Sequence, residues 1–149
     1  MTNATKFNYI FFLIIIISGF HCKSTHNLTS QKEMYKSIYI DQFKLTYFRQ
    51  MLLKSYNNSK TIQEIIKLDH SGFTEPILTM EDYKLIDSLT AVDNQIMKID
   101  STNSIGKVAE GAEGKHPLGF ILNKIESKWL DSLALKRLKL AGIPKSWIE

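Results

Sequence analysis

Apolar side chains recur every three or four residues along most of the chain after residue 31, as in helices that bury one face. Four segments carry this pattern: 31–56, 61–68, 79–100 and a last one that starts near Pro117. No segment shows the sustained alternation of apolar and polar residues that strands require. The pattern therefore predicts an all-α fold, a small bundle of three long helices and one short helix.

The first long segment is apolar on two sides. One row consists of Met34, Ile38, Leu45, Leu52 and Tyr56, and the other of Tyr35, Tyr39, Phe43, Tyr47 and Met51. A helix that is apolar on two sides is typical of a central, doubly packed position. The aromatic row could instead line a groove for a ligand, but an unfilled row of this length favours aggregation. We therefore expect it to pack in the core.

The short helix lies between two turn signals. The stretch "YNNSKT" predicts a turn, and Thr61 with Glu64 three residues later predicts a capping box at the helix start. Its apolar side consists of Ile62, Ile65, Ile66 and Leu68. Gly72 and Pro76 then prevent the helix from continuing.

The third helix has a regular apolar row. Thr79 and Asp82 form a second capping pattern at its start, and acidic residues there favour the positive end of the helix dipole. The row steps by four and three residues through Leu85, Leu89, Val92, Ile96 and Ile99, with Asp87, Asp93 and Asp100 outside it. Two heptads are too few for a free-standing coiled coil, so we expect this row to pack inside the bundle.

The last helix begins near Pro117, a residue favoured in a first turn, and ends before Gly142 and Pro144. Its apolar row consists of Leu118, Leu122, Ile125, Trp129 and Leu133. Basic residues in its final turns suit the negative end of the helix dipole and need no partner. We expect Trp147 and Ile148 to fold back onto the bundle.

The N-terminal residues predict export. Lys6 precedes an apolar run from Tyr9 to Ile17, which is followed by Ser18 and Gly19, the order found in a secretory signal peptide. The run is shorter than the roughly 20 apolar residues that span a bilayer. We expect a leader over 1–21 that is cleaved, with an uncleaved N-terminal anchor as the alternative.

Cys22 directly follows the apolar run and is the only cysteine, so the chain cannot form an internal disulfide. This arrangement resembles the acylated cysteine of bacterial lipoproteins, although His21 stands where that family has a small residue. The resemblance covers residues 6 to 23 and implies cleavage before Cys22 and lipidation of its thiol. The alternative is a cut near Gly19 that leaves a free thiol.

Residues 23–31 are small and polar, which predicts a flexible tether, so we expect a lipidated Cys and flexible tether over 22–31 and a single helical domain over 32–149. The resemblance implies an exported protein anchored in the cell-envelope membrane; a soluble periplasmic or secreted protein is the alternative. The net charge is +4, and removal of Lys6 with the leader leaves +3. This charge is compatible with an anionic membrane surface but too diffuse to indicate nucleic acid.

The stretch "AEGAEGKHP", residues 109–117, contains the candidate chemistry. It resembles a phosphate-binding loop, but Ala109 replaces the first glycine, Glu110 and Glu113 repel phosphate, and no strand precedes it. Glu110, Glu113 and His116 could ligate a metal, but di-iron bundles need a second Glu-x-x-His motif, which is missing. The remaining interpretations are a glycine-rich structural connection and a partner-binding loop that includes Lys115.

No other motif indicates catalysis. Ser71 beside His70 does not form the Gly-x-Ser-x-Gly nucleophile elbow of a hydrolase. We predict no catalytic residue and no cofactor. The chain is expected to bind a protein partner, as an accessory, scaffold or immunity-type protein. A metal-dependent or unidentified envelope enzyme that uses His70, Glu110, Glu113 and His116 is the alternative.

Overall fold

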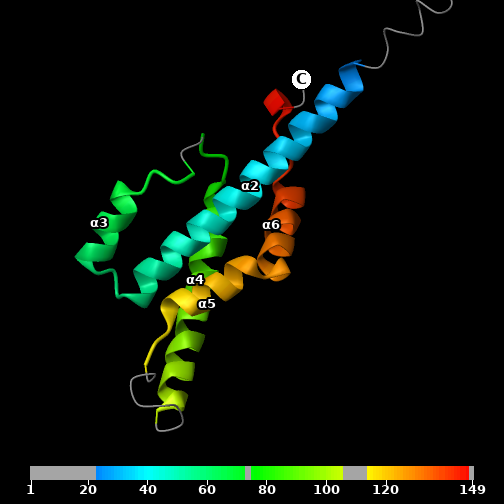
Figure 1. Cartoon of the computed structure of the whole chain (residues 1–149). Coiled ribbons are helices and arrows are strands. Elements are labelled where there is room, and N and C mark those ends of the chain that lie inside the picture. Colours follow the sequence, from blue (N-terminus) through cyan, green and yellow to red (C-terminus); the bar gives the residue numbers. More distant parts are fainter. Residues whose placement is uncertain (1–22, 73–74, 106–113, 148–149) are drawn as a thin grey trace, which may run out of the picture. The chain divides into compact units, whose positions relative to one another are not determined.

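The computed structural model describes residues 23–72, 75–105 and 114–147, and all regular structure in these ranges is helical (Figure 1). The all-α prediction is therefore confirmed for this part of the chain. The helices are α2 (Lys23–Ser55), α3 (Lys60–Leu68), α4 (Met80–Ser104), α5 (Pro117–Glu126) and α6 (Lys128–Ala141), and a 3₁₀ turn, η1 (Lys145–Trp147), follows them.

The chain divides into two compact units. The larger is Lys36–Gly142, and the described part of the other consists of residues 23–35 and 143–147. In the smaller unit the Trp147 ring meets the Tyr35 ring edge-on, with centroids 5.1 Å apart and planes at 67°. Trp147 therefore packs on the N-terminal part of α2 within this smaller unit, and Ile148 lies outside the described residues.

Helix α2 differs from the sequence prediction at its start, because it begins at Lys23 and makes residues 23–31 helical rather than a flexible tether. Its aromatic row is buried as expected: Tyr35, Tyr39, Phe43, Tyr47 and Met51 are all at most 3% exposed. The ligand-groove interpretation of this row is therefore wrong, because no part of it faces solvent. Of the other row, Met34 is 50% exposed.

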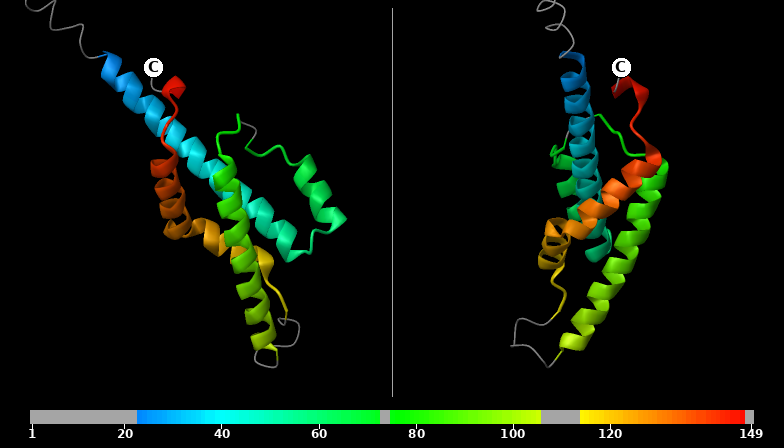
Figure 2. Two further views of the ribbon diagram at one scale, coloured as in Figure 1. Left: turned by 180° about the vertical axis from the view of Figure 1, so that it is seen from behind. Right: turned by 90° about the vertical axis from the view of Figure 1, so that its right-hand side faces the viewer.

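Side-chain contacts join α4 to its neighbours within residues 36–142. Tyr47 and Lys54 of α2 bond Asp93 and Asp87 of α4, in reverse order, where the two helices cross. Asp82 and Asp93 of α4 bond Arg137 of α6 and Lys124 of α5, also in reverse order. Figure 2 shows α2 and α4 running in the same general direction and crossing each other, while α6 returns the opposite way.

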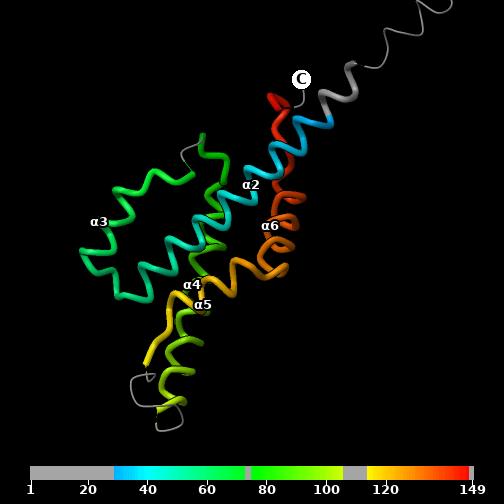
Figure 3. The backbone as a smooth tube through the Cα atoms, in the orientation of Figure 1, coloured from blue at the N-terminus to red at the C-terminus, as the bar shows by residue number. Residues whose placement is uncertain are grey.

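The last helix is broken, contrary to the prediction of one continuous helix. Ser127 adopts an extended conformation (φ −70°, ψ 134°) between α5 and α6, and Figure 3 shows the chain changing direction there. The Ser127 amide and hydroxyl both donate to the Lys124 carbonyl, at 3.2 and 2.6 Å. These bonds satisfy a carbonyl at the end of α5 that would otherwise lack a partner.

The helix ends follow local sequence signals in most cases. The Thr79 amide donates to the Asp82 carboxylate (2.8 Å) and the Asp82 amide to the Thr79 hydroxyl (3.3 Å), which confirms the predicted capping box. Gly142 ends α6 with a φ of +77°, a conformation that favours glycine. The predicted box at Thr61 is wrong, because Ser59 caps α3 by accepting from the Ile62 amide at 3.4 Å.

Candidate functional site

Helix α4 buries a different face from the one that its apolar spacing predicts. The buried residues are Asp82, Ile86, Thr90, Asp93 and Met97. In the predicted row, Val92 is 60%, Ile96 42% and Ile99 49% exposed, while Leu85 and Leu89 are half-buried. The prediction that this row packs inside the bundle is therefore wrong: the helix is rotated by about one residue.

Asp93 explains part of this rotation, since a buried carboxylate needs compensating partners. One of its oxygens accepts a hydrogen bond from the Tyr47 hydroxyl at 2.6 Å, and the other contacts the Lys124 ammonium at 2.8 Å. Burial and the adjacent carboxylate raise the pKa of Tyr47 above its ordinary value. The Lys124 ammonium also lies 4.9 Å from the Trp129 ring centroid and 5.5 Å from that of Phe120. Tyr47 and Lys124 together compensate the buried carboxylate of Asp93.

Asp82 holds the N-terminal end of α4 in the same orientation. Its side chain is fully buried, and its carboxylate accepts from the Arg137 guanidinium at 2.9 Å and from the Thr79 hydroxyl at 3.0 Å. Burial disfavours the ionised carboxylate, but hydrogen bonds from Thr79 and Arg137 outweigh it, and the pKa of Asp82 is lowered. The charged partners of the two buried aspartates of α4 therefore lie on α5 and α6.

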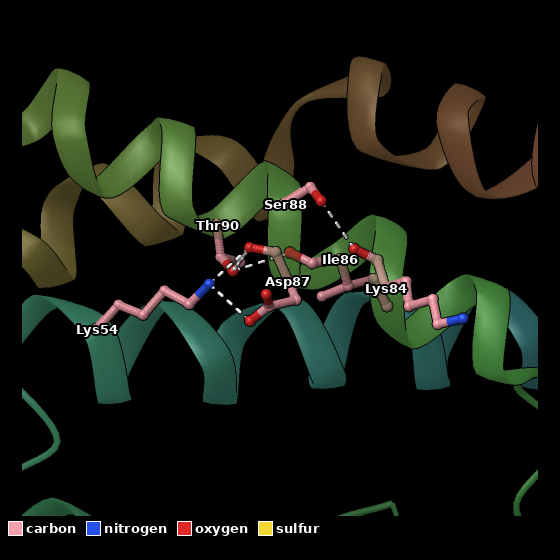
Figure 4. A network of polar contacts seen from close by, with 6 residues as sticks. All are labelled: Lys54, Lys84, Ile86, Asp87, Ser88 and Thr90. Carbon is pink, nitrogen blue, oxygen red and sulfur yellow. Dashed lines mark hydrogen bonds and ion pairs between the residues drawn. The ribbon is translucent and has the colours of Figure 1, made fainter.

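A third contact ties α4 to α2 (Figure 4). The Lys54 ammonium donates to the Asp87 carbonyl at 2.6 Å and to its carboxylate at 2.8 Å. The buried Thr90 hydroxyl lies within hydrogen-bond distance of the Asp87 and Ile86 carbonyls, at 3.0 and 2.8 Å. These bonds fix the middle of the helix between the two buried aspartates.

The rotation leaves an uncharged surface on α4. At about 3.6 residues per turn, seven residues fall within one third of the helix circumference. We call them the α4 strip: Leu85, Ser88, Leu89, Val92, Gln95, Ile96 and Ile99. No charged residue interrupts this side between Leu85 and Ile99, and the central apolar side chains are about half exposed. Such a continuous apolar face on a small domain is typical of a surface that binds another protein.

The α5–α6 segment shows the same displacement. The side chains that it buries are Pro117, Ile121, Leu130, Ala134 and Leu138. Of the predicted row, Leu118, Leu122 and Trp129 are 56%, 52% and 48% exposed. The predicted row is therefore wrong here as well, and the charged contacts of Lys124 and Arg137 explain the difference, because they turn those two residues inward.

Helix α3 buries none of its side chains. Ile65 and Leu68 are 54% and 76% exposed, and Ile62 and Ile66 are half-buried. A helix of nine residues is marginal in water without tertiary packing. Its N-terminal end is held by the Ser59 cap and by a 2.7 Å hydrogen bond from Gln63 to the Asn58 carbonyl.

A cavity of about 700 Å³ lies beside the loop that connects α3 to α4, and His70, Ser71 and Tyr83 are among its lining residues. Arg49 of α2 donates to the Asp69 carboxylate at 3.0 Å and to the Ser71 carbonyl at 2.9 Å. Hydrogen bonds from Ser71 and Arg49 lower the pKa of Asp69 to about 2. These polar groups hold the loop in place.

The predicted site residues fall partly within the described chain. Cys22, Glu110 and Glu113 lie outside it. Lys115 and His116 are exposed, and the His116 carbonyl accepts from the Phe120 amide at 3.1 Å as α5 begins. In the ranges that the structure describes, no group of three or more His, Cys, Asp or Glu side chains is placed to hold a metal ion.

Comparison with known proteins identifies no relative: no protein family, curated protein or solved structure matches the chain. None of the helices within the described ranges has the length and apolar character needed to cross a bilayer. The candidate site is therefore defined by geometry alone. It is the α4 strip. The apolar spacing predicted this row of residues but placed it in the core, whereas the structure exposes it.

Proposed function

We propose that this protein is an exported helical binding protein of the bacterial cell envelope, anchored through lipidated Cys22, whose α4 strip binds a partner protein. The exposure of Val92, Ile96 and Ile99 along one side of α4 carries this proposal. The leader over 1–21 and the resemblance of Cys22 to the acylated cysteine of lipoproteins support the location.

The strip favours a partner with an amphipathic helix. Its apolar residues step by four and three, the spacing that presents a continuous row to a second helix. Since the α4 strip contains no charged residue, the partner needs no counter-charge along the centre of the contact. Recognition of an amphipathic helix through anchors at this spacing is a common binding mode.

Substitutions in the strip test this function. Val92→Glu with Ile96→Glu places two charges at its centre, and Leu118→Glu with Leu122→Glu is the matched control on exposed apolar residues of α5. A partner crosslinked in the envelope, then purified and titrated against each variant, should lose roughly 30-fold or more in affinity for the strip variant only. Equal affinities for the two variants would contradict the proposal.

The anchor is tested separately. The wild-type chain should incorporate labelled palmitate, and the Cys22→Ser chain should not. Equal labelling of the two chains, or no label in either, rejects lipidation at Cys22 and leaves the α4 strip to be judged by its own titration.

A further inference from the structure

Helix α6 presents a basic face to solvent. Lys128, Ser132, Lys136 and Lys139 are exposed and, at about 3.6 residues per turn, lie on one side of the helix. Trp129 and Leu140 flank this side and are 48% and 72% exposed. We call Lys128, Lys136, Lys139, Trp129 and Leu140 the basic face.

The other two charged residues of α6, Asp131 and Arg137, form ion pairs with residues of other helices. Asp131, the only acidic residue of α6, lies 2.8 Å from the Lys44 ammonium of α2. Arg137 points the opposite way and bonds Asp82 at 2.9 Å. In the part of the chain that the structure describes, no acidic group forms an ion pair with the three lysines of the basic face.

The helix dipole explains only part of the basic face. Lys139 lies in the last turn, where a cation is favourable, but Lys128 is the first residue of α6, where the positive end of the dipole disfavours it. The break at Ser127 creates this second helix start, which a continuous last helix lacks. Lys128 therefore lies at a position that the helix dipole does not favour for a cation.

We propose that the basic face of α6 docks on an anionic phospholipid surface. Lysines near such a surface are attracted to its headgroups, and tryptophan favours the boundary between headgroups and acyl chains. Trp129 is suited to this place because Lys124 lies 4.9 Å from its ring centroid and steadies a ring that is half exposed. Leu140 adds a second apolar side chain at the edge of the lysines.

This surface is distinct from the α4 strip and requires no lipid on Cys22. It adds a second contact with the membrane that depends on lipid charge and salt. A basic surface is a common second membrane signal beside a lipid anchor. The test therefore uses the full chain with Cys22→Ser, so that no acyl chain contributes.

The experiment measures partition of this chain into vesicles of phosphatidylcholine alone and of phosphatidylcholine mixed with phosphatidylglycerol. The ratio of the two partition coefficients cancels any binding of the N-terminal residues that does not depend on lipid charge. Lys128→Gln, Lys136→Gln and Lys139→Gln together should reduce this ratio on the order of 100-fold, or roughly 5-fold for each lysine. High salt should abolish the difference.

The matched control combines Lys60→Gln, Lys67→Gln and Lys84→Gln, which removes the same charge from exposed positions on α3 and α4. This control variant should keep most of the ratio between the two partition coefficients. An equal loss in both triple variants, or no preference for phosphatidylglycerol in the parent chain, overturns the proposal. So does equally tight, equally lysine-dependent binding to a DNA duplex, which would indicate a general polyanion site. Circular dichroism verifies that both variants remain helical.

A fluorescent dye attached to the cysteine of a Ser132→Cys variant tests whether the basic face contacts the lipid. With phosphatidylglycerol vesicles its fluorescence should be quenched by brominated acyl chains, and the same dye on Ser88→Cys of α4 should not respond. Quenching at position 88 but not at 132 would show that a different surface meets the lipid, and would overturn the proposal.

Discussion

The Tyr47 hydroxyl donates a 2.6 Å hydrogen bond to the buried carboxylate of Asp93, and this bond joins two helices whose paired residues are 46 positions apart in the chain. The bond, together with the Lys124 ammonium on the other carboxylate oxygen, determines which side of α4 faces the core. The apolar strip is exposed because this polar face is buried.

Tyr47→Phe should lower the free energy of unfolding by about 2 kcal/mol, the usual value of a hydrogen bond to a charged group. The ring still fills its place, so the loss reports the hydroxyl alone. Urea denaturation measures it, with Tyr56→Phe at an exposed position as the control. An equal effect at the two positions would show that Asp93 does not depend on Tyr47.

The rotation of α4 can be measured with two isoleucines. Ile86 is fully buried and Ile96 is 42% exposed. Ile86→Ala should cost roughly 2–5 kcal/mol of unfolding free energy, the range for truncation in a core, and Ile96→Ala less than about 1 kcal/mol. The reverse order would mean that the row predicted from the spacing is the buried one after all.

Asp82 should make stability depend on pH in the acidic range. The pKa of the Asp82 carboxyl is lowered in the folded protein, whereas in the unfolded chain it is about 3.9. Its contribution is therefore fully present above the unfolded pKa and is lost as the pH falls through the folded pKa.

Asp82→Asn should cost about 3 kcal/mol at neutral pH, because it leaves Arg137 without its carboxylate, and should flatten the loss of stability below pH about 4. Unfolding free energies from pH 7 down to pH 2–3 measure both effects, and Asp100→Asn, at an exposed position, should follow the wild type. If Asp82→Asn loses stability at low pH as steeply as the wild type, other carboxylates cause that loss.

Two glycines should respond to alanine with opposite signs. Gly72 has a φ of +69°, and a Cβ there meets the Leu45 side chain, so Gly72→Ala should destabilise by about 1–2 kcal/mol. Gly119 lies within α5 with open space around it, so Gly119→Ala should stabilise by about 0.5–1 kcal/mol. Thermal unfolding of both variants measures the two changes in stability. Changes of the same sign would contradict the geometry of the loop at Gly72.

The cap of α3 is tested by a pair of neighbouring hydroxyls. Ser59→Ala should weaken the helix by about 1 kcal/mol, since it removes the acceptor for the Ile62 amide. Thr61→Ala lies inside the helix and should leave it unchanged or slightly stronger. Hydrogen exchange of the α3 amides separates the two cases, and faster exchange only in Thr61→Ala would restore the capping box at Thr61.

The sequence alone determined where several helices are and how they end. Its three-to-four spacing showed that the chain is helical, and Thr79 with Asp82, Pro117 and Gly142 marked ends that the structure confirms. These signals act within a few residues, so they can be seen without a fold. The capping box at Thr61 failed within the same range, because Ser59 offers its hydroxyl two residues earlier.

Only the tertiary structure decided which side of each helix is buried. The apolar rows of α4 and of the last two helices pointed one way, but Asp82, Asp93, Lys124 and Arg137 pair across 31 and 55 residues and turn the helices another way. A buried charge without its partner costs more than an exposed isoleucine, so the pairs prevail over the apolar spacing. The α4 strip and the basic face of α6 both result from this choice, which needs the three-dimensional position of the partners.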